Sequence, residues 1–184
     1  MKNDLFSIGP FTVHGYGLMI AIGVLSAYYM VEYRAKKKQM DWEKVFPLTV
    51  WSVLGGFLGS KILYLLTRLP DILANPALLG SSIKDGFVVY GGIIGGILTA
   101  WIYCKCTKWN FWKIFDIAMP AVAMAQGFGR IGCLLAGCCY GIELDPANPI
   151  GIVFHNSAYA PNDVALLPTQ IISSVLDFAN CFVL

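Results

Sequence analysis

One arginine stands among glycines in an otherwise apolar stretch of the sequence. Arg130 lies in residues 126–133, which read QGFGRIGC. The small glycines leave room for a ligand to approach both the backbone and the guanidinium group. A guanidinium presents a planar fork of donors that suits phosphate, and a lipid headgroup is the natural anion at a membrane surface. Arg130 is therefore a candidate phosphate-binding residue, the alternative being an interfacial anchor that only touches lipid phosphate.

Three cysteines follow Arg130 closely. Cys133, Cys138 and Cys139 form a C-x4-C-C pattern, which differs from the paired C-x2-C units of structural zinc sites, so no metal is predicted. Three interpretations stay open. The thiols could form a disulfide in an oxidising compartment, one could be a reactive thiolate beside Arg130, or they simply pack as small residues at a helix end.

Polar aromatic residues open two of the apolar segments. His14 and Tyr16 begin the first of them, and Tyr90 lies near the start of the third. Each alone is an ordinary interfacial residue. Together with Arg130 they could line one outward-facing cavity, in which an imidazole is the best-suited base and a phenol is a poor one at neutral pH.

A second basic side chain, Lys61, lies inside an apolar segment. Phe57 and Tyr64 fall on the same helical face as this lysine. Two interpretations are open: the side chain reaches towards the outer interface, or it lines a polar cavity within the membrane.

The composition places these residues in a membrane protein. The chain has 184 residues, of which 57% are hydrophobic and 13% charged, with a mean hydropathy of +0.65; soluble domains carry roughly 25% charged residues. The basic residues lie beside hydrophobic segments and form no soluble basic face, so no nucleic-acid partner is predicted. We expect an all-α, polytopic transmembrane helical bundle in the lipid bilayer, formed by one domain over residues 1–184. A span needs about 20 apolar residues, and the predicted spans are about 13–31, 46–66, 86–104, 115–130 and 168–184.

Basic residues are distributed unequally between the two sides of these spans. Eight follow spans one and three, and three lie on the other side, so the positive-inside rule predicts an N-terminus outside the cytoplasm. Residues 141–169 then form an ordered external loop. The first span is followed by Glu32-Tyr33-Arg34, and not by a cleavage site, which favours a retained helix over a signal peptide. The eight are Arg34, Lys36, Lys37, Lys38, Lys44, Lys105, Lys108 and Lys113, and the three are Lys2, Arg68 and Lys84.

Glycines recur at a spacing of four residues in two of the spans. Small residues at this spacing let helix backbones approach closely in lipid. Helix packing is therefore predicted for three pairs: Gly55/Gly59, Gly91/Gly95 and Gly92/Gly96.

These motifs, in this order, resemble the prolipoprotein diacylglyceryl transferase family over nearly the whole chain. The resemblance lies in residues 14–19 (HGYGLM), 59–61 (GSK), 85–95 (DGFVVYGGIIG), 129–141 (GRIGCLLAGCCYG) and 168–170 (PTQ). It implies a bacterial cytoplasmic (inner) membrane enzyme of lipoprotein biosynthesis. Such an enzyme moves the diacylglyceryl group of phosphatidylglycerol to the lipobox cysteine of a prolipoprotein signal peptide. A thioether forms, glycerol-1-phosphate leaves, and no cofactor is implied.

The resemblance also assigns roles to residues. Arg130 would hold the phosphate and stabilise the leaving group, and Tyr16 would hydrogen-bond the headgroup. The catalytic residues implied are Arg130, His14 and Tyr90. The phospholipid-binding residues implied are Tyr16, Arg130, Gly129, Gly141, Lys61 and Gln170, and Cys133, Cys138 and Cys139 form a possible thiol site.

The chain departs from the family pattern at several positions. Tyr90 stands where the family usually has histidine, Cys133 where it has asparagine, and Cys138 where it has glutamate. The chain also stops within its last apolar segment, whereas family members continue, so the resemblance implies a divergent, C-terminally truncated member. Two alternatives remain: a membrane thiol-redox protein using the three cysteines, and a non-catalytic phospholipid-binding remnant.

Overall fold

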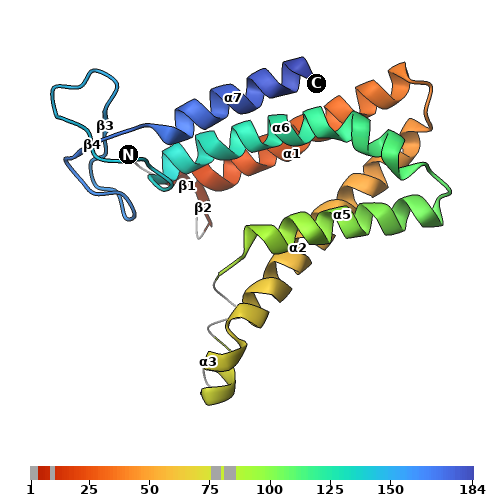
Figure 1. Ribbon diagram of the computed structural model, residues 1–184, viewed down its shortest axis with the longest axis horizontal. Helices are drawn as coiled ribbons and strands as arrows, with labels where there is room; N and C mark the ends of the chain where they lie inside the picture. The colour runs from red at the N-terminus through yellow and green to blue at the C-terminus, as the bar shows by residue number, and fades with distance from the viewer. Residues whose placement is uncertain (1–3, 9–10, 76–79, 81–85) are drawn as a thin grey trace. The chain divides into compact units, whose positions relative to one another are not determined.

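The computed structural model describes residues 4–8, 11–75, 80 and 86–184 (Figure 1). Lys2, Lys84 and Asp85, which entered the sequence predictions, lie outside the described residues. The helices are α1 (Gly15–Lys37), a short 3-10 helix η1 (Trp42–Lys44), α2 (Val45–Thr67), α3 (Leu69–Ala74), α5 (Val89–Cys106), α6 (Phe111–Ala136) and α7 (Thr169–Val183). The strands are β1 (Asp4–Ile8), β2 (Phe11–His14), β3 (Ile152–Val153) and β4 (Ala165–Leu166).

Within the described part of the chain, four helical segments are long and apolar enough to cross a membrane, which confirms the predicted polytopic helical fold. They are Gly15–Lys37, Trp42–Thr67, Val89–Cys106 and Phe111–Ala136, while α7 is a shorter apolar helix. One boundary differs from the prediction in a way that matters for the site. The fourth helix continues past Arg130 to Ala136 with Pro120 in its interior, so Arg130 and Cys133 lie on the same helix.

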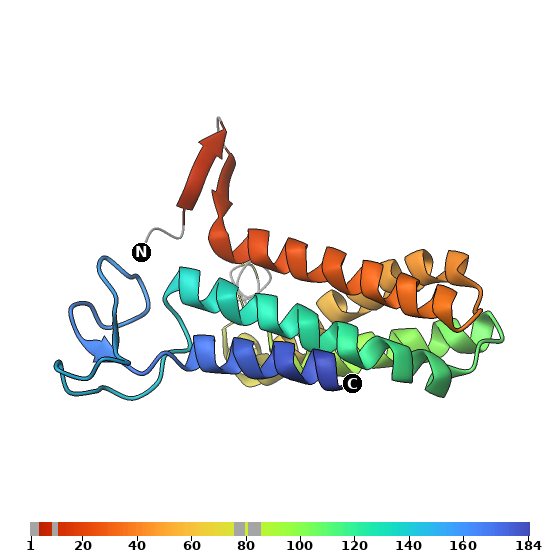
Figure 2. The same cartoon turned by 90° about the horizontal axis from the view of Figure 1, so that it is seen from above.

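The chain divides into two compact units, residues 1–34 with 116–184 and residues 35–115. In the first unit α1, α6 and α7 lie side by side (Figures 1 and 2). Glycines of α1 and α6 permit this packing: a methyl group at Gly23 would lie 3.1 Å from the carbonyl oxygen of Ala125, and one at Gly127 would lie 2.9 Å from the ring of Phe178. The buried hydroxyl of Ser174 donates to the carbonyl oxygen of Gly127 at 3.0 Å.

Residues 141–169 of the first unit form an ordered segment between α6 and α7. The antiparallel pair β3–β4 joins Ile152 to Leu166 and Val153 to Ala165. Leu166 of β4 forms a small buried core with Phe154 and Ala160. This segment therefore has its own buried core, as the sequence predicted for an ordered loop.

The second unit is built on the packing of α2 against α5. A methyl group at Gly59 would lie 2.9 Å from Cα of Gly95, and one at Gly95 would lie 3.0 Å from Cα of Gly59. The Ser60 hydroxyl donates to the Val88 carbonyl oxygen at 2.7 Å, and the Val88 amide donates back to the Ser60 carbonyl oxygen at 3.2 Å. The predicted close approach is confirmed at Gly55/Gly59 and Gly91/Gly95, where an added methyl group would overlap the facing helix. At Gly92 and Gly96 the nearest atoms would lie at 3.4 and 3.5 Å, so this third pair is less tightly packed.

Candidate functional site

A sharp turn at the end of α6 brings three cysteines together. Gly137, at φ +71°, follows the helix. The Gly137 amide donates to Leu134 at 3.2 Å, and the Cys138 amide donates to Cys133 at 3.0 Å. This is the glycine-terminated Schellman pattern, which reverses the chain at a helix end. The reversal returns the residues after the helix to the level of Cys133.

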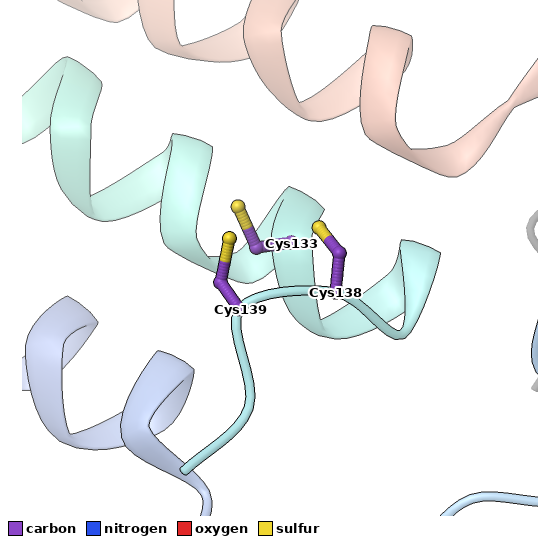
Figure 3. A group of neighbouring side chains, drawn as sticks. All are labelled: Cys133, Cys138 and Cys139. Carbon is purple, nitrogen blue, oxygen red and sulfur yellow. The ribbon is translucent and has the colours of Figure 1, made fainter. Parts of the chain in front are cut away.

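The three thiols converge. The Sγ atoms of Cys133, Cys138 and Cys139 all lie within 4.8 Å of one another. Figure 3 shows these three side chains at the end of α6 and in the loop that follows it. Cys139 adopts φ +59°, an uncommon conformation for a residue with a side chain. All six cysteines of the sequence are described, and all are free thiols. The cluster is thus a group of potential sulfur ligands, and not a disulfide.

The start of α7 holds the backbone of this cluster. Thr169 donates from Oγ1 to the carbonyl oxygen of Cys139 at 2.8 Å, and Gln170 donates from Nε2 to that of Cys138 at 2.8 Å. Gln170 is 1% exposed. Its Oε1 is buried and has no hydrogen-bond partner among the described residues. The predicted lipid-binding residue Gln170 is therefore placed against the cysteine loop.

Burial raises the pKa of the Cys138 thiol, and its hydrogen bond with Cys139 raises it further. Cys138 lies in the loop beyond α6. A raised pKa keeps this thiol protonated at neutral pH in the free protein. This direction is opposite to the one expected for a reactive thiolate activated by Arg130 alone.

Tyr16 packs against the helix that carries Arg130. A methyl group at Gly132 would lie 3.1 Å from Cδ2 of Tyr16 and 3.3 Å from Cβ of Met19, so a larger residue would require these neighbours on α1 to shift by a few tenths of an ångström. Tyr16 lies within electrostatic range of the Arg130 guanidinium and of all three cysteine thiols. The structure thus brings the predicted phosphate ligands and the thiol cluster into one neighbourhood of the first unit.

Space remains beside the arginine. Arg130 is half-buried, and a methyl group at Gly129 would meet no described atom within 4 Å. An anion could therefore approach Arg130 along the Gly129 side of α6. A half-buried guanidinium, a phenol and open space together suit a phosphate group.

Two other predicted residues of the first unit have different surroundings. His14 is exposed and ends β2 immediately before α1. Gly141 is packed against the chain before α7: its amide donates to the Leu167 carbonyl oxygen at 3.0 Å, and a methyl group there would lie 2.8 Å from Cγ2 of Thr169. Gly141 therefore shapes the path of the loop into α7.

Lys61 and Tyr90 belong to the second unit. Lys61 donates from Nζ to the Gly86 carbonyl oxygen at 3.1 Å, and its ammonium group lies 4.6 Å from the centre of the Phe87 ring. Tyr90 is 74% exposed on α5. Lys61 is thus engaged with a backbone carbonyl and aromatic rings near the start of α5.

The sequence analysis missed one acid inside an apolar helix. Asp177 of α7 accepts a hydrogen bond from Gln126 Nε2 of α6 at 3.2 Å, and its Oδ2 is buried with no partner among the described residues. The signal was present, because Gln170, Ser174 and Asp177 recur at helical spacing and mark one polar face.

The comparisons with known proteins agree on one family. The family model described as prolipoprotein diacylglyceryl transferase matches residues 3–184. A phosphatidylglycerol–prolipoprotein diacylglyceryl transferase of Clostridium tetani is 44% identical over 100% of this chain and 73% of its own length. Another, from Clostridium perfringens, is 43% identical over 97% of this chain and 69% of its own length. A relative from an Enterobacter species is 36% identical over 90% of this chain and 57% of its own length.

Proposed function

The chain belongs to the prolipoprotein diacylglyceryl transferase family, and we propose that it transfers the diacylglyceryl group of phosphatidylglycerol to the lipobox cysteine of a prolipoprotein. In this reaction a carbon–sulfur bond forms at the glycerol carbon that carried the phosphate. The carbon–oxygen bond to that phosphate breaks, and glycerol-1-phosphate leaves with the electron pair. The acceptor thiol loses its proton.

The observation that carries the proposal is the grouping of Arg130, Tyr16 and the open side of Gly129. Arg130 binds the phosphate of the lipid and stabilises the negative charge that develops on the leaving group. Arg130 lies two residues before Gly132, where α6 packs closely against Tyr16 of α1, so both side chains come from one helix–helix contact. Tyr16 donates a hydrogen bond to the headgroup.

We assign supporting roles to the other predicted site residues. His14 is the candidate base for the thiol proton, because an imidazole exchanges protons near neutral pH. Gln170 and Gly141 act by shaping the loop beside the lipid site. Lys61 and Tyr90 each lie in a segment that resembles a family motif, and on this ground we propose that each contacts the lipid or the substrate.

The chain is a multi-pass membrane protein of a bacterial family. We place its N-terminus outside the cytoplasm, supported by the excess of basic residues after the first and third spans. Arg130 then faces the outer leaflet, where a secreted prolipoprotein would present its lipobox cysteine.

The test uses phosphatidylglycerol labelled in its non-acylated glycerol, a lipobox peptide and the full chain purified in detergent. We expect peptide-dependent release of labelled glycerol phosphate. Arg130→Ala should abolish release, and Arg130→Lys should restore little of it, because an ammonium group lacks the planar fork of donors.

The matched control is Arg68→Ala. Arg68 is an exposed arginine bonded to Asp71 at 3.0 Å in the second unit, and its loss should leave release near the wild-type rate. No release by a folded wild-type protein that still binds the lipid would overturn the proposal and favour a phospholipid-binding remnant.

A further inference from the structure

We propose that Cys133, Cys138 and Cys139 bind one soft divalent cation of the Zn²⁺ class through their three sulfurs, leaving a fourth coordination position for the acceptor thiol. The metal site rests on the geometry of the cluster alone. The role of the fourth position rests on the proposed transferase function.

The distances between the three sulfurs fit a metal better than a disulfide. They lie within 4.8 Å of one another, whereas sulfurs on a tetrahedral zinc ion, with Zn–S about 2.3 Å, are about 3.8 Å apart. Metal binding therefore needs a contraction of about 1 Å at most. A disulfide needs about 2.05 Å between two sulfurs and would leave the third thiol without a role.

The cluster is also held in place. The Schellman turn at Gly137 returns the chain towards Cys133, and the hydrogen bonds from Thr169 and Gln170 fix the carbonyl groups of Cys139 and Cys138. Metal ligands on a rigid backbone lose little freedom when the ion binds. The sequence did not predict this site, because C-x4-C-C lacks the usual paired spacing and convergence depends on the turn and on α7.

The charges around the cluster suit such an ion. Three thiolates and one divalent cation carry a net charge of −1, and the positively charged Arg130 lies three residues before Cys133 on the same helix, which places the two on neighbouring positions of one helix face. Three protein ligands leave one position of a tetrahedral ion open, which is the arrangement of catalytic and not of structural zinc sites.

The open position would activate the acceptor. The lipobox thiol binds the ion and releases its proton to water. Metal coordination keeps the sulfur as a nucleophilic thiolate at neutral pH. This sulfur attacks the glycerol carbon, and the bond from that carbon to the phosphate oxygen breaks. Glycerol-1-phosphate leaves with the electron pair, and Arg130 stabilises the charge on its phosphate. The thioether product is a weaker ligand than a thiolate and leaves the ion.

The test uses the full chain in detergent, reduced and stripped of metal with a chelator, and Co²⁺ as the spectroscopic probe. We expect one equivalent of Co²⁺ to bind with sulfur-to-cobalt charge-transfer bands, and Zn²⁺ to displace it. Cys133→Ser should weaken Co²⁺ binding by more than about 100-fold, since even outer partners of metal sites are worth about 10- to 100-fold.

Two matched measurements guard against misfolding. Cys106→Ser, at an exposed cysteine of α5, should bind Co²⁺ as the wild type does. In the wild type itself, Zn²⁺ should protect three cysteines that react with an alkylating reagent in the metal-free protein. Wild-type protein that binds no Co²⁺, or in which Zn²⁺ protects no further thiols beyond those already shielded by burial, such as Cys104 and Cys181, would overturn the metal site.

The acceptor role has a separate readout. A lipobox peptide should shift the bound Co²⁺ spectrum, and the same peptide with serine in place of cysteine should not. An unchanged spectrum would overturn this role. Cobalt binding without glycerol phosphate release would contradict the transferase and leave the metal site standing, whereas release by metal-free protein would contradict the acceptor role and leave the transferase standing.

Discussion

The side chain of Gln170 donates to the carbonyl oxygen of Cys138 at 2.8 Å across a gap of 32 residues in the chain. This bond ties the start of α7 to the loop after α6. Thr169 makes the neighbouring bond to Cys139, so two consecutive residues of α7 position two consecutive cysteines. The geometry of the thiol cluster therefore depends on a helix that contributes no thiol to it.

Replacement of Gln170 should destabilise the protein and loosen the cluster. Gln170→Ala removes the donor and leaves the Cys138 carbonyl group unpaired, which costs about 1–3 kcal/mol when the group is buried. We expect a lower thermal unfolding midpoint in detergent. Gln170→Glu should also destabilise, because a carboxylate cannot donate to a carbonyl. An unfolding midpoint equal to that of the wild type for both variants would contradict the positioning role.

Two glycines beside Arg130 should respond in opposite ways to alanine. A methyl group at Gly132 would lie 3.1 Å from Tyr16, whereas one at Gly129 meets no described atom within 4 Å. Gly132→Ala should therefore displace Tyr16 and lower both the unfolding midpoint and transfer. Gly129→Ala should keep or raise the midpoint, since alanine favours a helix over glycine by about 1 kcal/mol.

The transfer assay then separates packing from binding at these glycines. If lipid approaches Arg130 along the Gly129 side, Gly129→Ala should raise the KM for phosphatidylglycerol in a protein that is fully folded. Unchanged KM in that variant would place the lipid on another side of the arginine.

The buried carboxylate of Asp177 should lower the stability of the wild-type protein. Its Oδ2 is buried without a described partner, and a carboxylate in an apolar environment is unfavourable unless it is paired. Asp177→Asn keeps an acceptor for Gln126 and removes the charge, so the unfolding midpoint should rise. Gln126→Leu, which deprives Asp177 of its described hydrogen bond, should lower the midpoint. A lower midpoint for Asp177→Asn would contradict this prediction, because it would show that the charged carboxylate stabilises the folded protein.

Sequence alone predicted the features that depend on local composition. Long apolar segments gave the membrane helices, because a bilayer requires about 20 such residues. Glycines four residues apart predicted close helix packing, because only small residues permit backbone contact in lipid, but they did not show that α2 packs on α5. The role of Arg130 was inferred from the cost of a charge within a span and stays a prediction.

The remaining features depend on contacts between distant parts of the chain. The fourth span was predicted at about 115–130, whereas the helix that carries it continues through Leu134, Leu135 and Ala136, which favour helices, and ends at the turn of Gly137. Convergence of the cysteines requires that turn and the two bonds from α7. Neither the spacing C-x4-C-C nor the motif PTQ could show that these two segments meet.

The packing of α2 on α5 offers the last prediction, because the glycines at that interface differ in the space around them. A methyl group at Gly59 would lie 2.9 Å from Cα of Gly95, and backbone cannot move aside as a side chain can. At Gly96 the nearest atom would be the Ser52 carbonyl oxygen at 3.5 Å, which is ordinary contact. Gly59→Ala should therefore destabilise by about 1–3 kcal/mol, and Gly96→Ala should be neutral or slightly stabilising. Unfolding midpoints of the two variants, measured side by side in one detergent, check the difference. Equal midpoints would mean that α2 and α5 do not meet through Gly59 and Gly95 in the folded protein.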